Sequence, residues 1–308
     1  MTPLASLTPA AAPAVLQIVL GSPADASFAP GLPVLAGAAV EQLFGVATPA
    51  GQSGCLTLFR HHDWLLGGAT LPTTDGLEAA AHRLYLDLFR AVRGLHLARI
   101  WNYVPGINAT GPGGLENYRL FSRARSLAFE QHYGPGFKQL LPAASAVGTP
   151  GATLSLAFAA SPLTPRHIEN PLQVAAYNYP GEYGPRPPSF ARATIVTGPT
   201  GRTAFISGTA AIRGHATVAP QRFAPQLACT IENLRRISEA SGLGPDLARD
   251  TSAQRHFKVY LRHAADQAAA AAVLQRELFC PADQVTYLQA DICREALVVE
   301  IEATLFGI

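Results

Sequence analysis

The chain has 308 residues, which is enough for one large domain or two ordinary domains with a substantial buried core. Only 14% of its residues are charged, the formal net charge is +2, and its basic residues include just two lysines, Lys138 and Lys258. Because no run of like charges, basic helix or RNA-binding aromatic motif occurs in the sequence, nucleic-acid binding is not expected.

The chain begins with an apolar stretch, residues 1–21. This stretch falls short of the ~18 apolar residues of a membrane span and lacks the positive start of a secretory signal. It is expected to lead into a strand in a cytoplasmic protein that does not contact a membrane.

Regular elements follow in the first half. Apolar residues at helical spacing predict a helix from Thr73 to Arg93, ended by Gly94. A strand is expected from His96 to Val104, a second helix from about Leu115 to Tyr133, and then a loop and strand within residues 141–160.

Between the halves lies the densest group of unusual residues, 169–196. Its prolines and glycines exclude a regular helix, so Tyr177, Tyr179 and Tyr183 are expected at strand ends or in an ordered loop. These tyrosines could contact a substrate or could pack as a proline-aromatic linker. A small turn at Ser207–Thr209 then leaves backbone N–H groups free to meet an anion.

The second half repeats the order of the first. A helix is expected from Phe223 to Ser241, a strand from His256 to Arg262 and a helix from Ala264 to Phe279. Each half therefore has the pattern hairpin, helix, strand, helix, strand, which predicts a duplicated α+β fold with helices on one face of each mixed sheet. The predicted domains are residues 1–150 and 151–308.

The last strand, within residues 293–303, carries two acidic residues on one face. Aliphatic residues alternate along it with Val298, Glu300 and Glu302. The acidic face meets either water, as in a solvated edge strand, or a substrate. The first half has Ser155 at the position of Glu300, and this difference leaves both interpretations open.

Taken together, four segments resemble the chorismatase family, whose C-terminal half has the RidA-like fold of trimeric enamine and imine deaminases. The segments are RIWNYVPGIN with ENYRLFSRAR, then ENPLQVAAYNYPGEYGPRPPSFARA, FISGTAAIRGH and ICREALVVEIEA. They occur in this order from about Arg99 to Phe306, whereas the first hundred residues contain no matching motif. The resemblance implies two RidA-like halves, the first degenerate, in an enzyme that removes pyruvate from chorismate.

The resemblance assigns the catalytic acid to Glu300, because the first glutamate of the VEIE strand has this role in the family. Cleavage of the enol ether of chorismate begins with proton transfer to carbon, so the acid must be protonated near neutral pH. Three features would raise the pKa of Glu300. They are its apolar flanks, the charge of the substrate, and Glu302, which lies roughly 7 Å away on the same face. Glu302 itself is expected to be structural.

The two carboxylates of chorismate require paired donors, for which the planar guanidinium of arginine is suited. Arg125 and Arg192 occupy matching motifs, and Arg119 and Arg186 are further candidates. With 21 arginines in the chain, surface ion pairs account for most of the others.

Four more contacts are implied by motif position only. Tyr177 and Tyr183 would close over the substrate ring or donate to a carboxylate. Thr209 and the amide of Gly208 would hold the enolpyruvyl group.

Cys293 separates the branches of the family. A lone cysteine is most often a small buried hydrophobe. In the branch that makes 3-hydroxybenzoate and pyruvate, however, a cysteine occupies this place. The resemblance therefore implies that Cys293 guides the ring intermediate towards 3-hydroxybenzoate, and some members also release 4-hydroxybenzoate.

Three alternatives stay open. The chain could hydrolyse chorismate to a dihydroxycyclohexadiene carboxylate and pyruvate, or be a catalytically silent RidA-like module that binds a small metabolite or a protein. A deaminase or acylase of the same fold is a third possibility. Simple deaminases of this fold are about half as long, and Val285 replaces their usual arginine, which argues for another substrate.

No cofactor is implied, because the sequence has no CxxC pair, no metal-ligand spacing of histidines, no phosphate-binding glycine loop and no Schiff-base lysine candidate. A duplicated chain can supply internally the interface that small members form between subunits. A monomer is therefore expected, although a homo-oligomer stays possible. Its cleft should lie between the halves, beside the tyrosine loop and the last strand.

Overall fold

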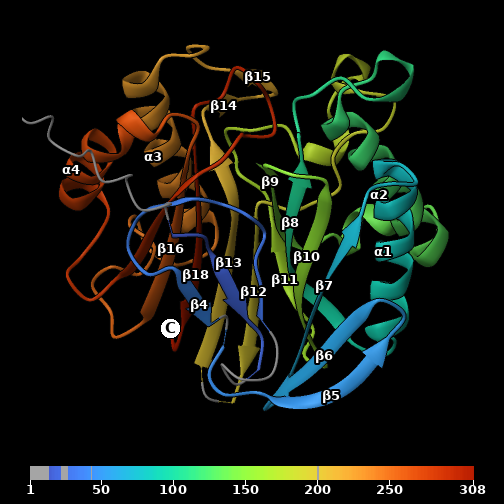
Figure 1. Ribbon diagram of the computed structural model, residues 1–308. Coiled ribbons are helices and arrows are strands. Elements are labelled where there is room, and N and C mark those ends of the chain that lie inside the picture. The colour runs from blue at the N-terminus through green and yellow to red at the C-terminus, as the bar shows by residue number, and fades with distance from the viewer. Residues whose placement is uncertain (1–13, 22–26, 43, 200) are drawn as a thin grey trace, which may run out of the picture.

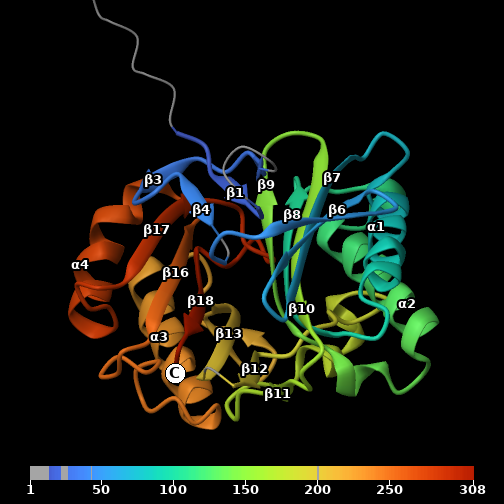
Figure 2. The same cartoon turned by 90° about the horizontal axis from the view of Figure 1, so that it is seen from below.

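The computed structural model describes residues 14–21, 27–42, 44–199 and 201–308. Two mixed β-sheets pack face to face at the centre, and helices cover the outer face of each sheet (Figure 1). The view turned by 90° shows the same four layers, with α3 and α4 on one side and α1 and α2 on the other (Figure 2). A substrate site can therefore form where the two sheets meet.

The first sheet has six strands in the order β5-β6-β7-β10-β8-β9. Its elements are β5 (Thr48–Ser53), β6 (Leu56–His61), β7 (Trp64–Pro72), α1 (Leu77–Ala91), β8 (His96–Pro105), α2 (Asn117–Tyr133), β9 (Ala143–Thr149) and β10 (Thr153–Ser161). Helix α1 begins four residues later than predicted. The reason is that Thr73 donates from its N–H and its hydroxyl to the Ala152 carbonyl, so residues 73–76 form a turn.

The second sheet has seven strands in the order β11-β12-β13-β18-β16-β17-β3. Its elements are β3 (Val34–Ala36), β11 (Arg166–Ile168), β12 (Ala193–Gly198), β13 (Gly201–Ala210), α3 (Phe223–Ala240), β16 (Gln254–Leu261), α4 (Gln267–Glu277), β17 (Gln284–Gln289) and β18 (Val299–Phe306). The predicted helices and strands are all present, with ends that differ by a few residues.

The two halves share one topology. In each, a hairpin is followed by a helix, a strand, a helix and a parallel strand, and the last strand returns antiparallel to the centre of the sheet. Ser155 of β10 lies opposite Tyr103 of β8, as Glu300 of β18 lies opposite Tyr260 of β16. The predicted α+β class and the duplication are therefore confirmed.

The sheets do not divide the chain at residue 150. Strand β10 follows this residue but pairs with β7 and β8 at the centre of the first sheet. The N-terminal strand β3 pairs with β17 at the edge of the second sheet. Because each half closes with a strand that returns to its own centre, the division between the sheets falls between β10 and β11.

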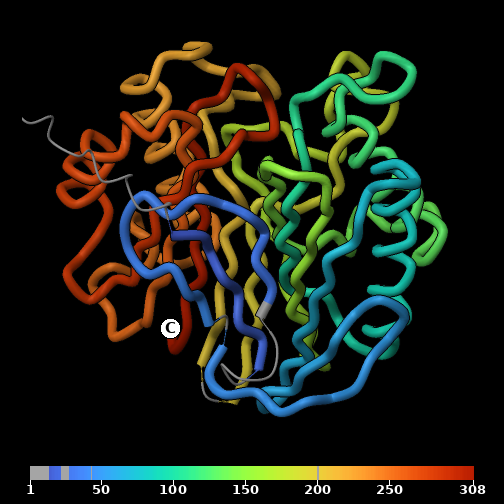
Figure 3. The backbone as a smooth tube through the Cα atoms, viewed as in Figure 1, coloured from blue at the N-terminus to red at the C-terminus, as the bar shows by residue number. Residues whose placement is uncertain are grey.

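The N-terminal segment lies across the strands of the central layers (Figure 3). Strands β1 (Gln17–Val19), β2 (Ser27–Phe28) and β4 (Val40–Gln42) form a small sheet. Ile18 is fully buried in the core between the two large sheets, with Trp101 and Phe205. The expected lead-in over residues 1–13 lies outside the described residues. None of the described helices is long and apolar enough to cross a membrane.

Candidate active site

A cavity of about 370 Å³ opens between the two halves. Its volume is within the range of small-molecule sites. Six of the predicted site residues line it: Arg125, Tyr183, Arg192, Gly208, Cys293 and Glu300. Strand β9 and helix α2 of the first half contribute to its wall together with β13 and β18 of the second.

Two predicted contacts, Tyr177 and Thr209, do not line this cavity. Tyr177 packs against the hydrophobic core beneath α1 and α2. The Thr209 hydroxyl donates to the Ser207 carbonyl at 2.9 Å, and Thr209 pairs with Ile301, whose side chain lies in the core beneath α3. Thr209 therefore lies on the helix-covered face of the sheet.

Glu300 lies at the inner face of β18, between Ala210 of β13 and Tyr260 of β16. Its side chain borders the cavity but is only 3% exposed. Burial and the charge of Glu302 raise the pKa of Glu300 to about 8, against the opposing effect of Arg99 and Arg192. The Glu300 carboxyl therefore carries a proton at neutral pH.

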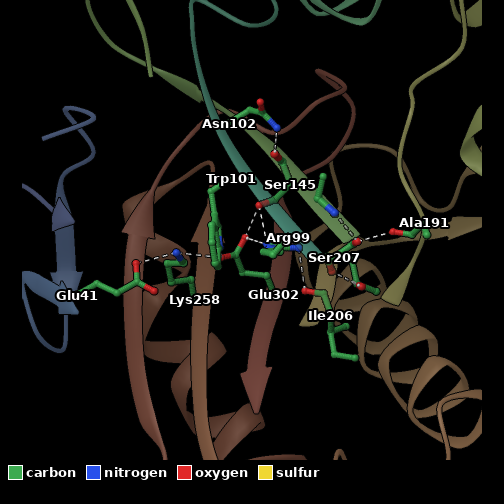
Figure 4. Close-up of polar contacts among 12 residues, drawn as sticks. Glu41, Arg99, Trp101, Asn102, Ser145, Ala191, Ile206, Ser207, Lys258 and Glu302 are labelled. Atoms are coloured by element: carbon green, nitrogen blue, oxygen red, sulfur yellow. Dashed lines mark hydrogen bonds and ion pairs between the residues drawn. The ribbon is translucent and has the colours of Figure 1, made fainter. Parts of the chain in front are cut away.

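Glu302, two residues further along the same face, has a different environment (Figure 4). It accepts hydrogen bonds from Arg99 Nη2 at 2.7 Å, Trp101 Nε1 at 2.9 Å and Ser145 Oγ at 2.5 Å, and it lies 2.9 Å from Lys258 Nζ. Burial opposes ionisation, but Lys258, Arg99 and the Ser145 hydroxyl hold the pKa of Glu302 below its usual value. The two neighbouring glutamates therefore hold opposite protonation states.

Two arginines border the cavity with unsatisfied donors. Arg125, on α2, is 1% exposed, and its Nε and Nη2 atoms have no hydrogen-bond partner among the described residues. In the same set of residues Arg192 Nε also lacks a hydrogen-bond partner and lies 3.9 Å from Glu169 Oε2, while Arg192 Nη2 donates to the Tyr179 hydroxyl at 2.7 Å. Both guanidinium groups lie over the Phe190 ring, with Cζ 5.9 Å (Arg125) and 4.9 Å (Arg192) from its centroid. Since buried N–H groups without acceptors are costly, this arrangement fits an anionic ligand.

The other two predicted arginines lie in different environments. Arg119 lines the cavity and is 3.6 Å from Glu116. Arg186 instead donates to Glu130 of α2 at 2.5 Å and does not line the cavity.

Comparison with known proteins bears on this arrangement. The family model for the N-terminal part of FkbO/Hyg5-like chorismatases matches residues 45–160. A 3-hydroxybenzoate synthase of Streptomyces hygroscopicus is 33% identical over 266 residues, which cover 83% of this chain and 77% of that protein. The chain belongs to the chorismatase family.

Two further matches agree with this membership. A chorismatase of Streptomyces hygroscopicus is 39% identical over 260 residues, which cover 82% of this chain and 75% of that chorismatase. A chorismatase crystal structure, 34% identical, superposes with a TM-score of 0.76 and covers 84% of this chain and 79% of that one.

Cys293 lines the cavity on the segment between β17 and β18. Burial and the nearby Glu300 raise the pKa of the Cys293 thiol to about 12. The thiol is therefore neutral in this member of the chorismatases, and it can shape the cavity but is a poor nucleophile.

One part of the cavity wall consists of stacked cationic and aromatic groups. Arg294 Cζ lies 4.1 Å from the Tyr183 ring centroid and 5.2 Å from that of Tyr179. Arg294 Nη1 donates to the His215 carbonyl at 2.8 Å, and the Tyr183 hydroxyl lies 3.1 Å from His215 Nδ1. Tyr183 is thus held in the cavity wall.

Sequence reasoning did not assign several residues that build the site. They are Arg99, Ser145, Tyr179, Lys258 and Arg294. Arg99 and Lys258 did carry a signal, since each is a charged residue with an apolar residue directly before and after it in its strand. Their partner could not be read from the sequence, because Arg99 and Glu302 are 203 positions apart.

Proposed function

We propose that this chain converts chorismate into 3-hydroxybenzoate and pyruvate, with Glu300 as the general acid. The observation that carries the proposal is a protonated carboxyl in a cavity that also presents two arginines with unsatisfied N–H groups. An enol ether that bears two carboxylates needs both features. Membership of the chorismatase family supports the same substrate.

The reaction begins when Glu300 transfers its proton to the methylene carbon of the enolpyruvyl group. The ether carbon then carries positive charge that it shares with the ether oxygen. When the bond between this oxygen and the ring breaks, its electron pair stays on the oxygen, which becomes the keto oxygen of pyruvate. The ring is left electron-deficient at C3, the carbon that carried the ether. The oxygen of the neighbouring C4 hydroxyl bonds to C3 and its bond to C4 breaks, which places the oxygen on C3. Loss of the hydrogen on C3 as a proton then makes the ring aromatic as 3-hydroxybenzoate, and the one proton released overall can return to Glu300.

Arg125 and Arg192 bind the two carboxylates of the substrate in this proposal. Both guanidinium groups are buried, so their hydrogen bonds to a carboxylate form in a site of low dielectric. Arg99 does not line the cavity, and its Nη2 already donates to Glu302 and Ser145. Gly208 borders the reacting end of the cavity beside Glu300.

Cys293 directs the outcome at the ring. A neutral thiol occupies space and excludes water without attacking the ring, which favours aromatisation over hydration. The 3-hydroxybenzoate and pyruvate together contain the atoms of chorismate, whereas the alternative diol product requires one added water. The relative named 3-hydroxybenzoate synthase supports the aromatic outcome.

The test is to supply the purified protein with chorismate and to quantify pyruvate and ring products by chromatography. Equal amounts of pyruvate and 3-hydroxybenzoate are expected, with 4-hydroxybenzoate as a possible minor product. Pyruvate with a non-aromatic diol would retain the acid and reject the role of Cys293. Absence of turnover would favour a small-molecule binding module.

Both halves of one chain line the cavity, which supports a monomer as the working form. Sedimentation at several protein concentrations checks this prediction. The cytoplasmic location stays a prediction.

A further inference from the structure

Arg99, Lys258 and Glu41 hold Glu302 from three different parts of the fold. Arg99 extends from β8 of the first sheet, Lys258 from β16 of the second, and Glu41 from the small N-terminal sheet. Lys258 Nζ lies 2.7 Å from Glu41 Oε2 and 2.9 Å from Glu302 Oε1 (Figure 4). Two cations and two carboxylates thus alternate across the interface between the sheets.

This network fixes the charge of Glu302. Four donors surround a carboxylate that is 2% exposed, so its protonation would leave the Arg99 and Lys258 cations without a full counter-charge. Burial alone would lower the pKa of Lys258, but Glu302 and Glu41 raise it above its usual value. Lys258 and Glu302 therefore stabilise each other in their charged forms.

Among the charged and titratable groups around Glu300, Glu302 is the principal source of negative charge. Those that act on Glu300 are Glu302 on its own strand, Arg99 from β8 and Arg192 from the segment before β12; Tyr260 of β16 and Cys293 lie beside it. Strand β13 presents Gly208 and Ala210, which carry no charge. A negative charge about 7 Å away on the same strand face favours the neutral form of a buried carboxyl.

We propose that Glu302 is a positioning residue for the acid, because its carboxylate, held ionised by Arg99 and Lys258, keeps Glu300 in the protonated state that proton donation requires. The proposal rests on the proposed role of Glu300. It explains why two glutamates of one strand can differ in function, since only Glu302 contacts the cations of the interface. Glu302 acts through Glu300 and does not line the cavity.

The test compares the pH profile of kcat/KM for the wild type, Glu302→Gln and Glu41→Gln. Glu302→Gln should move the alkaline limb of the profile to lower pH by about one unit. At pH values above the limb, this shift corresponds to a loss of kcat/KM on the order of tenfold. Glu41→Gln removes a carboxylate from the same lysine on the side away from Glu300, and its limb should stay close to that of the wild type. If the limb of Glu302→Gln stays in place while activity falls uniformly, the role of Glu302 is structural and the proposal is wrong.

Glu302→Asp is the conservative variant, because it keeps the charge at this position, and its alkaline limb should stay near that of the wild type. A limb that moves as far as in Glu302→Gln would contradict the proposal. If Glu302→Gln does not fold, infrared spectra of the wild type, Glu302→Asp and Glu300→Gln test the protonation state of Glu300 instead. At pH 7 the wild type and Glu302→Asp should show a protonated-carboxyl band that is reduced in Glu300→Gln, where Glu169, whose pKa burial raises to about 7, still contributes. A weaker band in Glu302→Asp than in the wild type, or an undiminished band in Glu300→Gln, would overturn the assignment.

The two proposals can fail separately. Full turnover by Glu300→Gln would remove the proposed acid itself. Loss of turnover in Glu300→Gln, together with an unmoved limb in Glu302→Gln, would reject only the role of Glu302.

Discussion

Gly208 and Glu300 are in direct contact across neighbouring strands. A Cβ atom built on Gly208 would lie 2.0 Å from Glu300 Oε1 and 3.2 Å from Ser145 Cβ. The contact arises at an irregularity in the pairing of β13 with β18, between Ile206 and Thr209, which brings the backbone of residue 208 against the carboxyl. Glycine is needed at this position because of the close approach.

Substitution Gly208→Ala should therefore displace the Glu300 carboxyl. We expect kcat/KM for chorismate to fall by about 100-fold, since a misplacement of about 1 Å has an effect of this size. The matched control is Gly136→Ala, because a Cβ at Gly136 meets no atom within 4 Å. Steady-state kinetics of both variants check the prediction, which is wrong if the two behave alike.

Loss of the Arg125 guanidinium should weaken substrate binding without loss of stability. Arg125→Met removes buried donors that lack a protein partner, so we expect KM to rise at least tenfold while the melting temperature stays equal or increases. Arg90→Met is the control, since the Arg90 side chain is 58% exposed. An unchanged KM in Arg125→Met would show that Arg125 does not bind a substrate carboxylate.

Replacement of Cys293 should change the product and not the first step. In Cys293→Ala we expect pyruvate release to stay within about tenfold of the wild type, while ring product shifts from 3-hydroxybenzoate towards the diol. Chromatography of the ring products measures the ratio. Because burial raises the pKa of this thiol to about 12, iodoacetamide at pH 8 should modify it slowly. An unaltered product ratio would refute the role assigned to Cys293.

Glu300 should lower the stability of the folded protein at neutral and alkaline pH. Its pKa rises from the usual 4.5 to about 8 on folding, so between these values the folded state binds a proton that the unfolded state releases. Stability due to this group therefore decreases as pH rises through that window. Glu300→Gln should be more stable than the wild type at pH 8 by about 4 kcal/mol, and nearly equal at pH 4.5. Urea unfolding of both proteins at both pH values measures this difference. Equal stabilities at pH 8 would contradict the prediction.

The sequence was sufficient to predict those features that depend on local periodicity. Alternation in β18 indicated that Glu300 and Glu302 share a face, and the repeated order of elements indicated the two halves. Their opposite protonation states were not predictable, because Arg99 comes from the other sheet and reaches Glu302 only after the sheets pack.

Thr209 shows a different limit of sequence reasoning. Regular alternation from Phe205, which faces the other sheet, would point Thr209 the same way. The irregular pairing between Ile206 and Thr209 shifts the alternation by one residue, so Thr209 faces the helices and Ala210 faces inward. A motif match gives the position of such a residue but not the face on which it lies.

The most direct test of the central claim is pyruvate release from chorismate by the wild type and by Glu300→Gln. We expect the wild type to release pyruvate and Glu300→Gln to keep its fold, seen by circular dichroism, but to lose turnover by at least about 1,000-fold. Retention of wild-type turnover by Glu300→Gln would contradict the assignment of the catalytic acid.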